Sequence, residues 1–311
     1  MYFQKLETIF MKFGKDNLNT HYINYIMRIL VLGHRGWIGQ MVVKLLEARG
    51  MDYVTTEVRP HDKYVFEEEI IRLNVTHVMS FIGRTHGVIG EKTYTTIDYL
   101  EEDGKLVENV RDNLFSPVVV AMLCKKLGLH FTYMGTGCIF KYEGDKLFNE
   151  EDLPNFFGSS YSVVKGYTDE LMHLFDNVLN LRIRMPIIGR DEPRNFISKI
   201  TRYERVCSVA NSMTVLDELL PYMIDMAEKK ITGTFNFTNP GTISHNEILE
   251  MYREYVEPEF TWKNFTIEEQ RKILAADRSN NHLDTSKLEK LYPDILPIRE
   301  SVKRVLMNYV K

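Results

Sequence analysis

Two tyrosine–lysine pairs with the spacing Tyr-x-x-x-Lys occur in this sequence, Tyr142…Lys146 and Tyr161…Lys165. The first pair encloses a Glu-Gly-Asp stretch typical of a turn, where side chains four positions apart do not meet. The second pair opens a predicted helix over residues 159–174, and residues four apart share one face of a helix. A lysine ammonium placed there lowers the pKa of the phenol, so that Tyr161 could donate a proton near neutral pH.

Thr136 ends a predicted strand, where its hydroxyl could bond the same substrate oxygen as Tyr161. The three cysteines, Cys124, Cys138 and Cys207, are too few and too scattered for a disulfide framework or a zinc site. We therefore expect no metal and a reduced, cytoplasmic location. A special role for any cysteine would have to come from the reactivity of its thiol.

A glycine-rich stretch with the spacing G-x-x-G-x-x-G follows the first predicted strand, as Gly33-His34-Arg35-Gly36-Trp37-Ile38-Gly39. The first glycine permits a tight turn, the second lets the backbone approach a pyrophosphate, and the third lets helix and strand pack closely. Free N–H groups at the start of the next helix would face the phosphates. The pattern predicts a dinucleotide site formed by these residues: Gly33, Arg35, Gly36, Trp37, Ile38, Gly39 and, after the third strand, Gly83.

The type of dinucleotide depends on charges near the end of the second strand. Glu57 stands about twenty residues after the glycine loop, where an acidic side chain would bind a ribose 2′-hydroxyl and favour NADH. Arg35 and Arg59 bracket the same place and would suit the 2′-phosphate of NADPH. We favour NADPH and keep NADH as the alternative, since Arg59 could also be an ordinary solvated charge.

The elements that must position these residues alternate between short β-branched runs and longer helical runs. We expect strands over residues 28–32, 52–58, 76–82, 130–135 and 178–184, and helices over 37–49, 65–73, 105–127 and 159–174. This alternation predicts an α/β fold, a Rossmann doubly wound parallel sheet with helices on both faces.

The domain organisation follows from the same pattern. Charged residues interrupt the apolar stretches within residues 1–26, so this segment lacks the features of a signal peptide. We expect it to form an N-terminal extension. Residues 27–185 form the NADP-binding Rossmann domain, to which a segment near 211–238 returns with a late strand. Residues 186–311 form mainly a smaller C-terminal substrate-binding lobe, since prolines and short helices dominate there.

Composition excludes two classes of partner. The formal net charge is −4, and no basic stripe stands out, so we expect no nucleic-acid binding. No apolar run approaches the roughly 18–20 residues that span a bilayer, so we expect no membrane segment. The predicted helices over 105–127 and 159–174 carry more apolar residues than one sheet face needs, which predicts a homodimer.

The order of glycine loop, threonine and Tyr-x-x-x-Lys is the signature of the extended short-chain dehydrogenase/reductase superfamily. A closer resemblance, to the UDP-4-keto-6-deoxyglucose 3,5-epimerase/4-reductase family, is carried by longer strings across the chain from about Met27 to its end. These include Gly135-Thr-Gly-Cys-Ile-Phe140, Pro193-Arg-Asn-Phe-Ile197, Leu216-Asp-Glu-Leu-Leu-Pro221, Asn236-Phe-Thr-Asn-Pro-Gly241 and Ser244-His-Asn-Glu-Ile-Leu249. More distantly the chain is similar to dTDP-4-dehydrorhamnose reductases.

The resemblance implies two reactions in one nucleotide-sugar pocket, giving UDP-L-rhamnose. In the reduction, Tyr161 would donate a proton to the sugar O4, Lys165 would lower the phenol pKa and hold the nicotinamide ribose, and Thr136 would position the carbonyl. In the epimerisation, Cys138 would exchange protons at C3 and C5, as in the similar enzyme that makes GDP-L-fucose. A small buried apolar cysteine is the alternative for Cys138.

The second acid/base group stays open between two residues. Lys199 matches a lysine of the family and would titrate near neutrality if it were desolvated, although a solvated helix lysine is the alternative. His86 is the reserve candidate. For the remainder of the substrate, the expected contacts are Arg84, His86, Asn195, Phe196, Arg202 and Arg278.

Two other functions compete with this interpretation. A 4-reductase could act alone on a sugar that is epimerised elsewhere, and the presence of Cys138 argues against it. A non-catalytic NADP-binding regulatory subunit would be free to lose Tyr161, Lys165 or Cys138, and the chain keeps all three.

Overall fold

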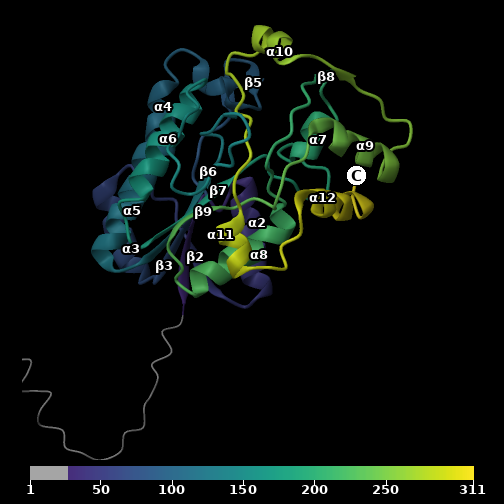
Figure 1. Cartoon of the computed structure of the whole chain (residues 1–311). Helices are drawn as coiled ribbons and strands as arrows, with labels where there is room; N and C mark the ends of the chain where they lie inside the picture. Colours follow the sequence, from purple (N-terminus) through teal and green to yellow (C-terminus); the bar gives the residue numbers. More distant parts are fainter. Residues whose placement is uncertain (1–26) are drawn as a thin grey trace, which may run out of the picture.

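A six-stranded parallel sheet lies at the centre of the molecule (Figure 1). The computed structural model describes residues 27–311, so the extension predicted at 1–26 lies outside the described residues. The strands are β1 (Arg28–Leu32), β2 (Asp52–Thr55), β3 (His77–Ser80), β6 (His130–Thr136), β7 (Val178–Ile183) and β9 (Gly233–Asn236). Their order is β2-β1-β3-β6-β7-β9, which confirms the Rossmann-like sheet and the late returning strand.

Helices cover both faces of this sheet because its strands are apolar on both sides. Ile29 and Val31 of β1 face one core, which is closed by α2 (Trp37–Ala48), α8 (Leu216–Glu228) and α11 (Ser286–Leu291). Leu30 and Leu32 of the same strand face the other core, under α3 (Lys63–Leu73), α5 (Ser116–Leu127) and α6 (Ser160–Met172). Strands buried on both faces are typical of parallel sheets.

The strand order creates a crevice at the carboxyl ends of β1 and β3. From β1 the chain crosses to β2 at the edge of the sheet, and then returns past β1 to β3. The two crossovers therefore run in opposite directions along the sheet, and place β2 and β3 on either side of β1. Ligands of open α/β sheets bind at such a switch point.

The long helix expected over residues 105–127 is interrupted by a π-helical turn. The helical segments are α4 (Leu106–Val110), the π turn η2 (Arg111–Phe115) and α5. Asn113 lies in this turn, fully buried, and its amide bonds the backbone N–H and C=O of Arg84, both at 2.9 Å. The wider turn therefore anchors the loop that follows β3, a feature that helical periodicity does not predict.

Two further differences from the expected elements concern short segments. Strand β2 ends at Thr55 instead of residue 58, and the Val58 N–H is bonded by the Thr56 hydroxyl at 3.1 Å. A hairpin was not expected between β3 and the long helix, where β4 (Gly87–Ile89) and β5 (Lys92–Tyr94) precede the 3₁₀ helix η1 (Ile97–Glu101).

The C-terminal lobe has a hydrophobic core of its own, at the side of the molecule opposite α4 and α5 (Figure 1). Its elements are α7 (Phe196–Ile200), β8 (Arg205–Val206), α9 (His245–Tyr255), β10 (Lys263–Asn264), α10 (Ile267–Ile273) and α12 (Ile298–Met307). The division at residue 185 stays a prediction. Across residues 27–311, no helix combines the length and apolarity needed to cross a membrane.

Candidate active site

The glycine-rich stretch forms a tight turn between β1 and α2. Gly33 has φ +77°, a conformation that side-chain-bearing residues rarely adopt, and the Gly36 N–H bonds its carbonyl at 2.9 Å. A Cβ added to Gly39 would lie 2.2 Å from the Gly33 carbonyl oxygen. The first and third glycines are therefore required by the close packing of strand against helix.

A cavity of about 220 Å³ lies beside this turn, at the switch point of the sheet. Among the residues predicted to bind the dinucleotide, Gly33, Arg35, Gly36, Arg59 and Gly83 line it. Trp37, Ile38 and Gly39 lie behind it in the first turns of α2. The buried Nε1 of Trp37 and Nδ1 of His34 have no hydrogen-bond partner among residues 27–311. The close glycine packing, the two unpaired polar atoms and the cations Arg35 and Arg59 together fit a bound dinucleotide.

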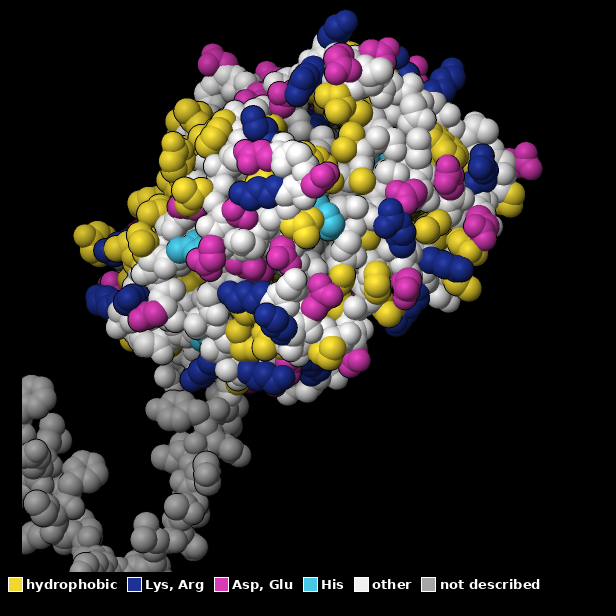
Figure 2. Space-filling view, viewed as in Figure 1, with side chains coloured by type: hydrophobic (Ala, Val, Ile, Leu, Met, Phe, Trp, Pro, Cys, Tyr) yellow, Lys and Arg dark blue, Asp and Glu magenta, His cyan; other side chains and the backbone are white. Residues whose placement is uncertain are grey.

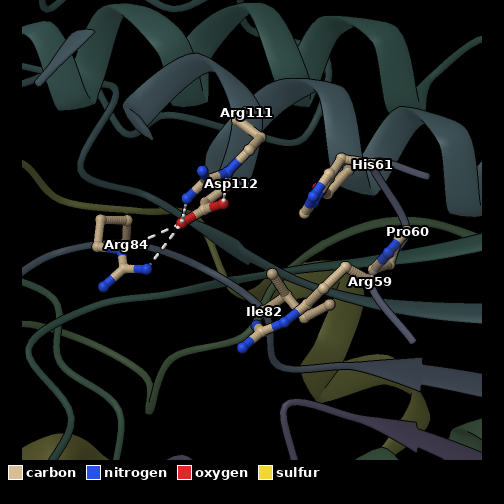
Figure 3. A pocket seen from close by; sticks show the side chains of 8 residues that line it. Arg59, Pro60, His61, Ile82, Arg84, Arg111 and Asp112 are labelled. Carbon is tan, nitrogen blue, oxygen red and sulfur yellow. Dashed lines mark hydrogen bonds and ion pairs between the residues drawn. The ribbon is translucent and has the colours of Figure 1, made fainter. Parts of the chain in front are cut away.

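A second cavity, of about 230 Å³, adjoins the first and is rich in arginine (Figure 3). Arg84 and Arg111 converge on Asp112, with N–O distances of 3.1 and 2.7 Å, while Arg59 lies across the cavity from them. Arg35 pairs with Glu57 at 2.5 Å. Arg84, which was predicted to bind substrate, lines both cavities, and its role in substrate binding stays a prediction.

The catalytic candidates meet where β6 ends and α6 begins. Thr136 is the last residue of β6, and its Oγ1 accepts the Cys138 N–H at 3.1 Å. The Cys138 carbonyl in turn accepts the Ser162 hydroxyl at 2.7 Å, within the first turn of α6. These two bonds join the threonine–cysteine loop to the helix that carries Tyr161 and Lys165.

Burial controls the titration of the tyrosine–lysine pair. Burial raises the pKa of Tyr161, Cys138 adds to that effect, and a hydrogen bond with Thr136 opposes it. Burial lowers the pKa of Lys165 to about 8, against the effects of Asp169 and Cys138. The expectation that Lys165 lowers the phenol pKa is not met in this structure, because the Lys165 ammonium donates its hydrogen bond to the hydroxyl of Tyr133.

A buried ion pair between Asp169 and Arg182 lies near Lys165, and Asp169 favours the charged form of that lysine. Asp169, one turn further along α6, accepts two hydrogen bonds from the Arg182 guanidinium at 3.0 and 2.6 Å and one from the Asn180 amide at 2.8 Å. Despite burial, which acts in the opposite direction, Arg182 and these hydrogen bonds hold the pKa of Asp169 near 2. The sequence analysis missed this pair, although an arginine inside a buried strand was a signal that it needed a partner.

A cluster of positive groups gathers between the loop after β3 and α7. Arg194 Nη2 lies 2.7 Å from His86 Nδ1. Burial lowers the pKa of His86 to about 4, with Arg194 and other cations adding to the effect. Burial, Arg194 and Arg278 lower the pKa of Lys199 to about 8. The sequence analysis did not select Arg194, which contacts His86 and lowers the pKa of Lys199.

The remaining candidates on this segment differ in what they can offer a ligand. Asn195 is fully buried and caps α7, and its amide bonds the backbone of Ile188 and Arg190. It therefore has no free polar atom. Arg202 is exposed and pairs with Asp191 at 2.6 Å, as a surface charge would. Phe196 packs edge-on against His245 at 5.2 Å between ring centroids.

A C-terminal segment connects the positive cluster to the threonine–cysteine loop. Arg278 pairs with Asp98 at 2.5 Å and contributes to the field on Lys199. Three residues later, Asn281 donates its amide to the Gly137 carbonyl at 2.9 Å. The buried Arg184 bonds the same carbonyl at 3.0 Å. Groups from both parts of the chain thus surround one site, and no cluster of three or more His, Cys, Asp or Glu side chains suited to a metal occurs within residues 27–311.

Comparison with known proteins agrees with this architecture. "Uncharacterized protein L780" of Acanthamoeba polyphaga mimivirus is 55% identical over 286 residues, which are 90% of this chain and 98% of that protein. A crystal structure described as the L780 UDP-rhamnose synthase superimposes with a TM-score of 0.88 over 91% of this chain and 99% of that one. A protein of Arabidopsis thaliana named bifunctional dTDP-4-dehydrorhamnose 3,5-epimerase/dTDP-4-dehydrorhamnose reductase is 46% identical over 88% of this chain and 90% of its own length.

A more distant structure shares the fold alone. The dTDP-4-dehydrorhamnose reductase of Bacillus anthracis, solved in complex with NADP, is 16% identical and superimposes with a TM-score of 0.75 over 90% of this chain and 99% of that one. The close matches confirm the resemblance inferred from the sequence strings. Because residues 27–311 match the RmlD substrate binding domain family, and two relatives at 46% and 55% identity align over nearly their whole length, the chain belongs to that family.

Proposed function

We propose that this protein is a bifunctional 3,5-epimerase/4-reductase that converts UDP-4-keto-6-deoxy-D-glucose to UDP-L-rhamnose with NADPH. The observation that carries the proposal is the meeting of Thr136, Cys138, Tyr161 and Lys165 at the junction of β6 and α6. A ketone reduction needs an acid and a cation, and the additional thiol suits the epimerisation. The relatives named as an epimerase/reductase and as a UDP-rhamnose synthase support the same reading.

The reductase half uses the α6 pair. A dinucleotide bound beside the glycine turn would supply the hydride for C4. The raised pKa of Tyr161 keeps its phenol protonated, which is the form that donates to O4. The Lys165 ammonium donates to the Tyr133 hydroxyl in the structure, and it would stabilise the tyrosinate only as that charge forms during the reaction. The Thr136 hydroxyl, already beside Tyr161, would hold O4 in line with the phenol.

The epimerase half needs groups that gain and lose protons near neutral pH. The 4-ketone acidifies the hydrogens at C3 and C5, so each centre inverts when one side chain removes a proton and another returns it from the opposite face. The Cys138 thiol stands beside Tyr161 and is partly exposed to the site. We assign it as one of the two groups.

Lys199 is the better candidate for the second group. Its lowered pKa, about 8, gives it a substantial neutral fraction near neutrality. His86, with a pKa lowered to about 4 and its ring against Arg194, would stay neutral and engaged. The cations around Lys199, Arg194 and Arg278, would also suit the diphosphate of a nucleotide sugar.

NADPH is the preferred cofactor because of charge at the second cavity. Arg59 faces the cavity that Arg84 and Arg111 also line, and a 2′-phosphate there would meet Arg59 while the other two arginines keep Asp112 (Figure 3). Glu57, the acidic residue that would otherwise bind the ribose 2′-hydroxyl and favour NADH, is paired with Arg35.

A homodimer is part of the proposal. Apolar side chains stand exposed along α4, η2 and α5, on the face of the molecule that is rich in hydrophobic atoms in Figure 2: Leu106, Val107, Val110, Phe115 and Met122. Val107 is 72% exposed, and a second copy would remove this patch from water. Val107→Glu should yield a monomeric mass in solution, whereas Met307→Glu, on the distant α12, should not. A monomeric wild-type mass at micromolar concentration would contradict the dimer.

The deciding experiment separates the two chemistries. The protein is incubated in D₂O with UDP-4-keto-6-deoxyglucose, with and without NADPH, and NMR follows both the product and deuterium at C3 and C5. Cys138→Ser should slow exchange by about 10²–10⁴-fold, since an alcohol is a far weaker acid than a thiol, while hydride transfer to a supplied 4-keto-rhamnose continues. Tyr161→Phe should block reduction and leave exchange.

Matched substitutions serve as controls for these variants. Cys207→Ser changes a cysteine in the C-terminal lobe, and Tyr142→Phe changes the tyrosine of the other Tyr-x-x-x-Lys pair, whose hydroxyl bonds the Ala210 carbonyl. Both should behave as wild type. Exchange at the wild-type rate in Cys138→Ser would leave a single-function reductase as the correct interpretation.

A further inference from the structure

The surroundings of Lys165 contain a side chain for which neither reaction has yet provided a role. Tyr133 lies in β6, three residues before Thr136, and is 1% exposed. Its hydroxyl accepts a hydrogen bond from the Lys165 ammonium, and the same ammonium lies 4.5 Å from the centre of its ring. Lys165 is itself only 4% exposed, so this contact replaces much of the hydration that the charge has lost.

The titratable groups around Lys165 come from three neighbouring elements. Tyr133 and Cys138 act on it from β6 and its following loop, and Asp169 acts on it from α6. Arg182 of β7 pairs with Asp169, and Tyr161 of α6 acts on Tyr133. Asp169 is not free to serve Lys165 alone, because Arg182 and Asn180 take its oxygens at 2.6 to 3.0 Å. Tyr133 is thus the side chain to which the Lys165 ammonium directly donates.

We propose that Tyr133 is a positioning residue of the reductase, which keeps the buried Lys165 ammonium charged and within reach of Tyr161. The proposal rests on the reductase role assigned above to Tyr161 and Lys165. A hydrogen bond from an ammonium to a phenol oxygen is stronger than one from a neutral amine. The contact therefore favours the protonated lysine over the neutral one.

Tyr133 acts as an acceptor and not as a second acid. Burial raises its pKa well above the ordinary value for a phenol, and Tyr161 and Asp169 add to the effect, so the hydroxyl remains neutral throughout the working range. Since it lies beneath the tyrosine–lysine pair in the apolar core, it is a residue that holds Lys165 and does not touch the sugar.

The test is Tyr133→Phe, which keeps the ring and removes only the hydroxyl. Without that acceptor, Lys165 should lose its proton at lower pH, and the alkaline limb of the kcat profile for reduction should move down by about one to two pH units. Below that limb kcat should stay within about threefold of wild type. Deuterium exchange at C3 and C5 should be unchanged. Tyr142→Phe is the control and should leave the limb in place.

Two results would overturn the proposal: an alkaline limb that coincides with wild type, or an equal loss of kcat at every pH. Circular dichroism and the melting temperature of Tyr133→Phe show whether the variant is folded. A folded variant that loses kcat equally at every pH counts against a positioning role. Tyr161→Phe distinguishes a failure of the proposed reductase function from a failure of the role of Tyr133. If that variant still reduces the substrate, the proposed function fails, whereas an unshifted profile in Tyr133→Phe rejects the role of Tyr133 alone.

Discussion

Arg194 is expected to set the pH at which Lys199 works, and Arg194→Met tests this directly. In the structure Arg194 contacts His86, and its charge is the second-largest cause of the lowered Lys199 pKa, after burial. Methionine fills a similar volume without the charge. Loss of the Arg194 charge should raise the pKa of Lys199. A smaller neutral fraction of Lys199 would then be available to accept a proton from C3 or C5.

The size of the effect follows from the structure. Burial, Arg194 and Arg278 together lower the Lys199 pKa from 10.5 to about 8, and burial is the largest of the three causes. Arg194 therefore accounts for about one unit at most, which is about a tenfold change in the neutral fraction at pH 7. The limb of the exchange profile that reports Lys199 should move up by about half a unit to one unit.

The assay is deuterium exchange into saturating UDP-4-keto-6-deoxyglucose, measured by NMR from pH 6 to pH 10. Saturation separates the titration of Lys199 from any weaker binding of the substrate diphosphate, which appears in KM. Arg299→Met is the matched control, because Arg299 is an exposed arginine of α12 paired with Glu247 at 2.8 Å. A profile of Arg194→Met that coincides with wild type would show that Lys199 is not the titrating group.

Three other substitutions test separate parts of the architecture. Gly39→Ala would place a methyl group 2.2 Å from the Gly33 carbonyl, so the variant should bind NADPH poorly in a fluorescence titration, and unchanged binding would contradict the tight turn. Arg59→Ala should weaken NADPH by about tenfold or more and NADH hardly at all, and equal losses for both would remove the 2′-phosphate assignment. Arg182→Met strands the buried Asp169 carboxylate and should cost about 3–5 kcal/mol in denaturant unfolding. A loss below about 1 kcal/mol would mean that the pair is not buried in solution.

The sheet was predictable because local signals agreed with the global arrangement. The apolar run of β1, the glycine turn and the alternation of strands and helices each point to the same fold, and β1 lies inside the parallel sheet as expected. The π turn at Asn113 was not predictable, because a single extra residue per turn leaves the apolar spacing on either side unchanged. The β4–β5 hairpin is short and mostly exposed, so it has no apolar alternation to detect.

The candidate active site was predictable to the extent that chemistry follows local spacing. Thr136, Cys138, Tyr161 and Lys165 were selected from spacing and resemblance, and the structure brings them together. Partnerships between distant segments were not visible. Nothing in the sequence near Tyr133 indicates that it will accept the Lys165 hydrogen bond. Nothing near Arg194 indicates that its long-range partner is His86.

The same positive field can serve both proposed reactions. Removing a proton beside the 4-ketone leaves an enolate, and donating one from Tyr161 leaves a tyrosinate, so each reaction passes through an anion at nearly the same place. Burial lowers the pKa values of Lys165, Lys199 and Arg194, which means that these cations are poorly compensated in the protein alone. Preorganised, undercompensated cations stabilise a developing anion without reorganisation. One pocket can therefore lower the barriers of proton exchange and of reduction.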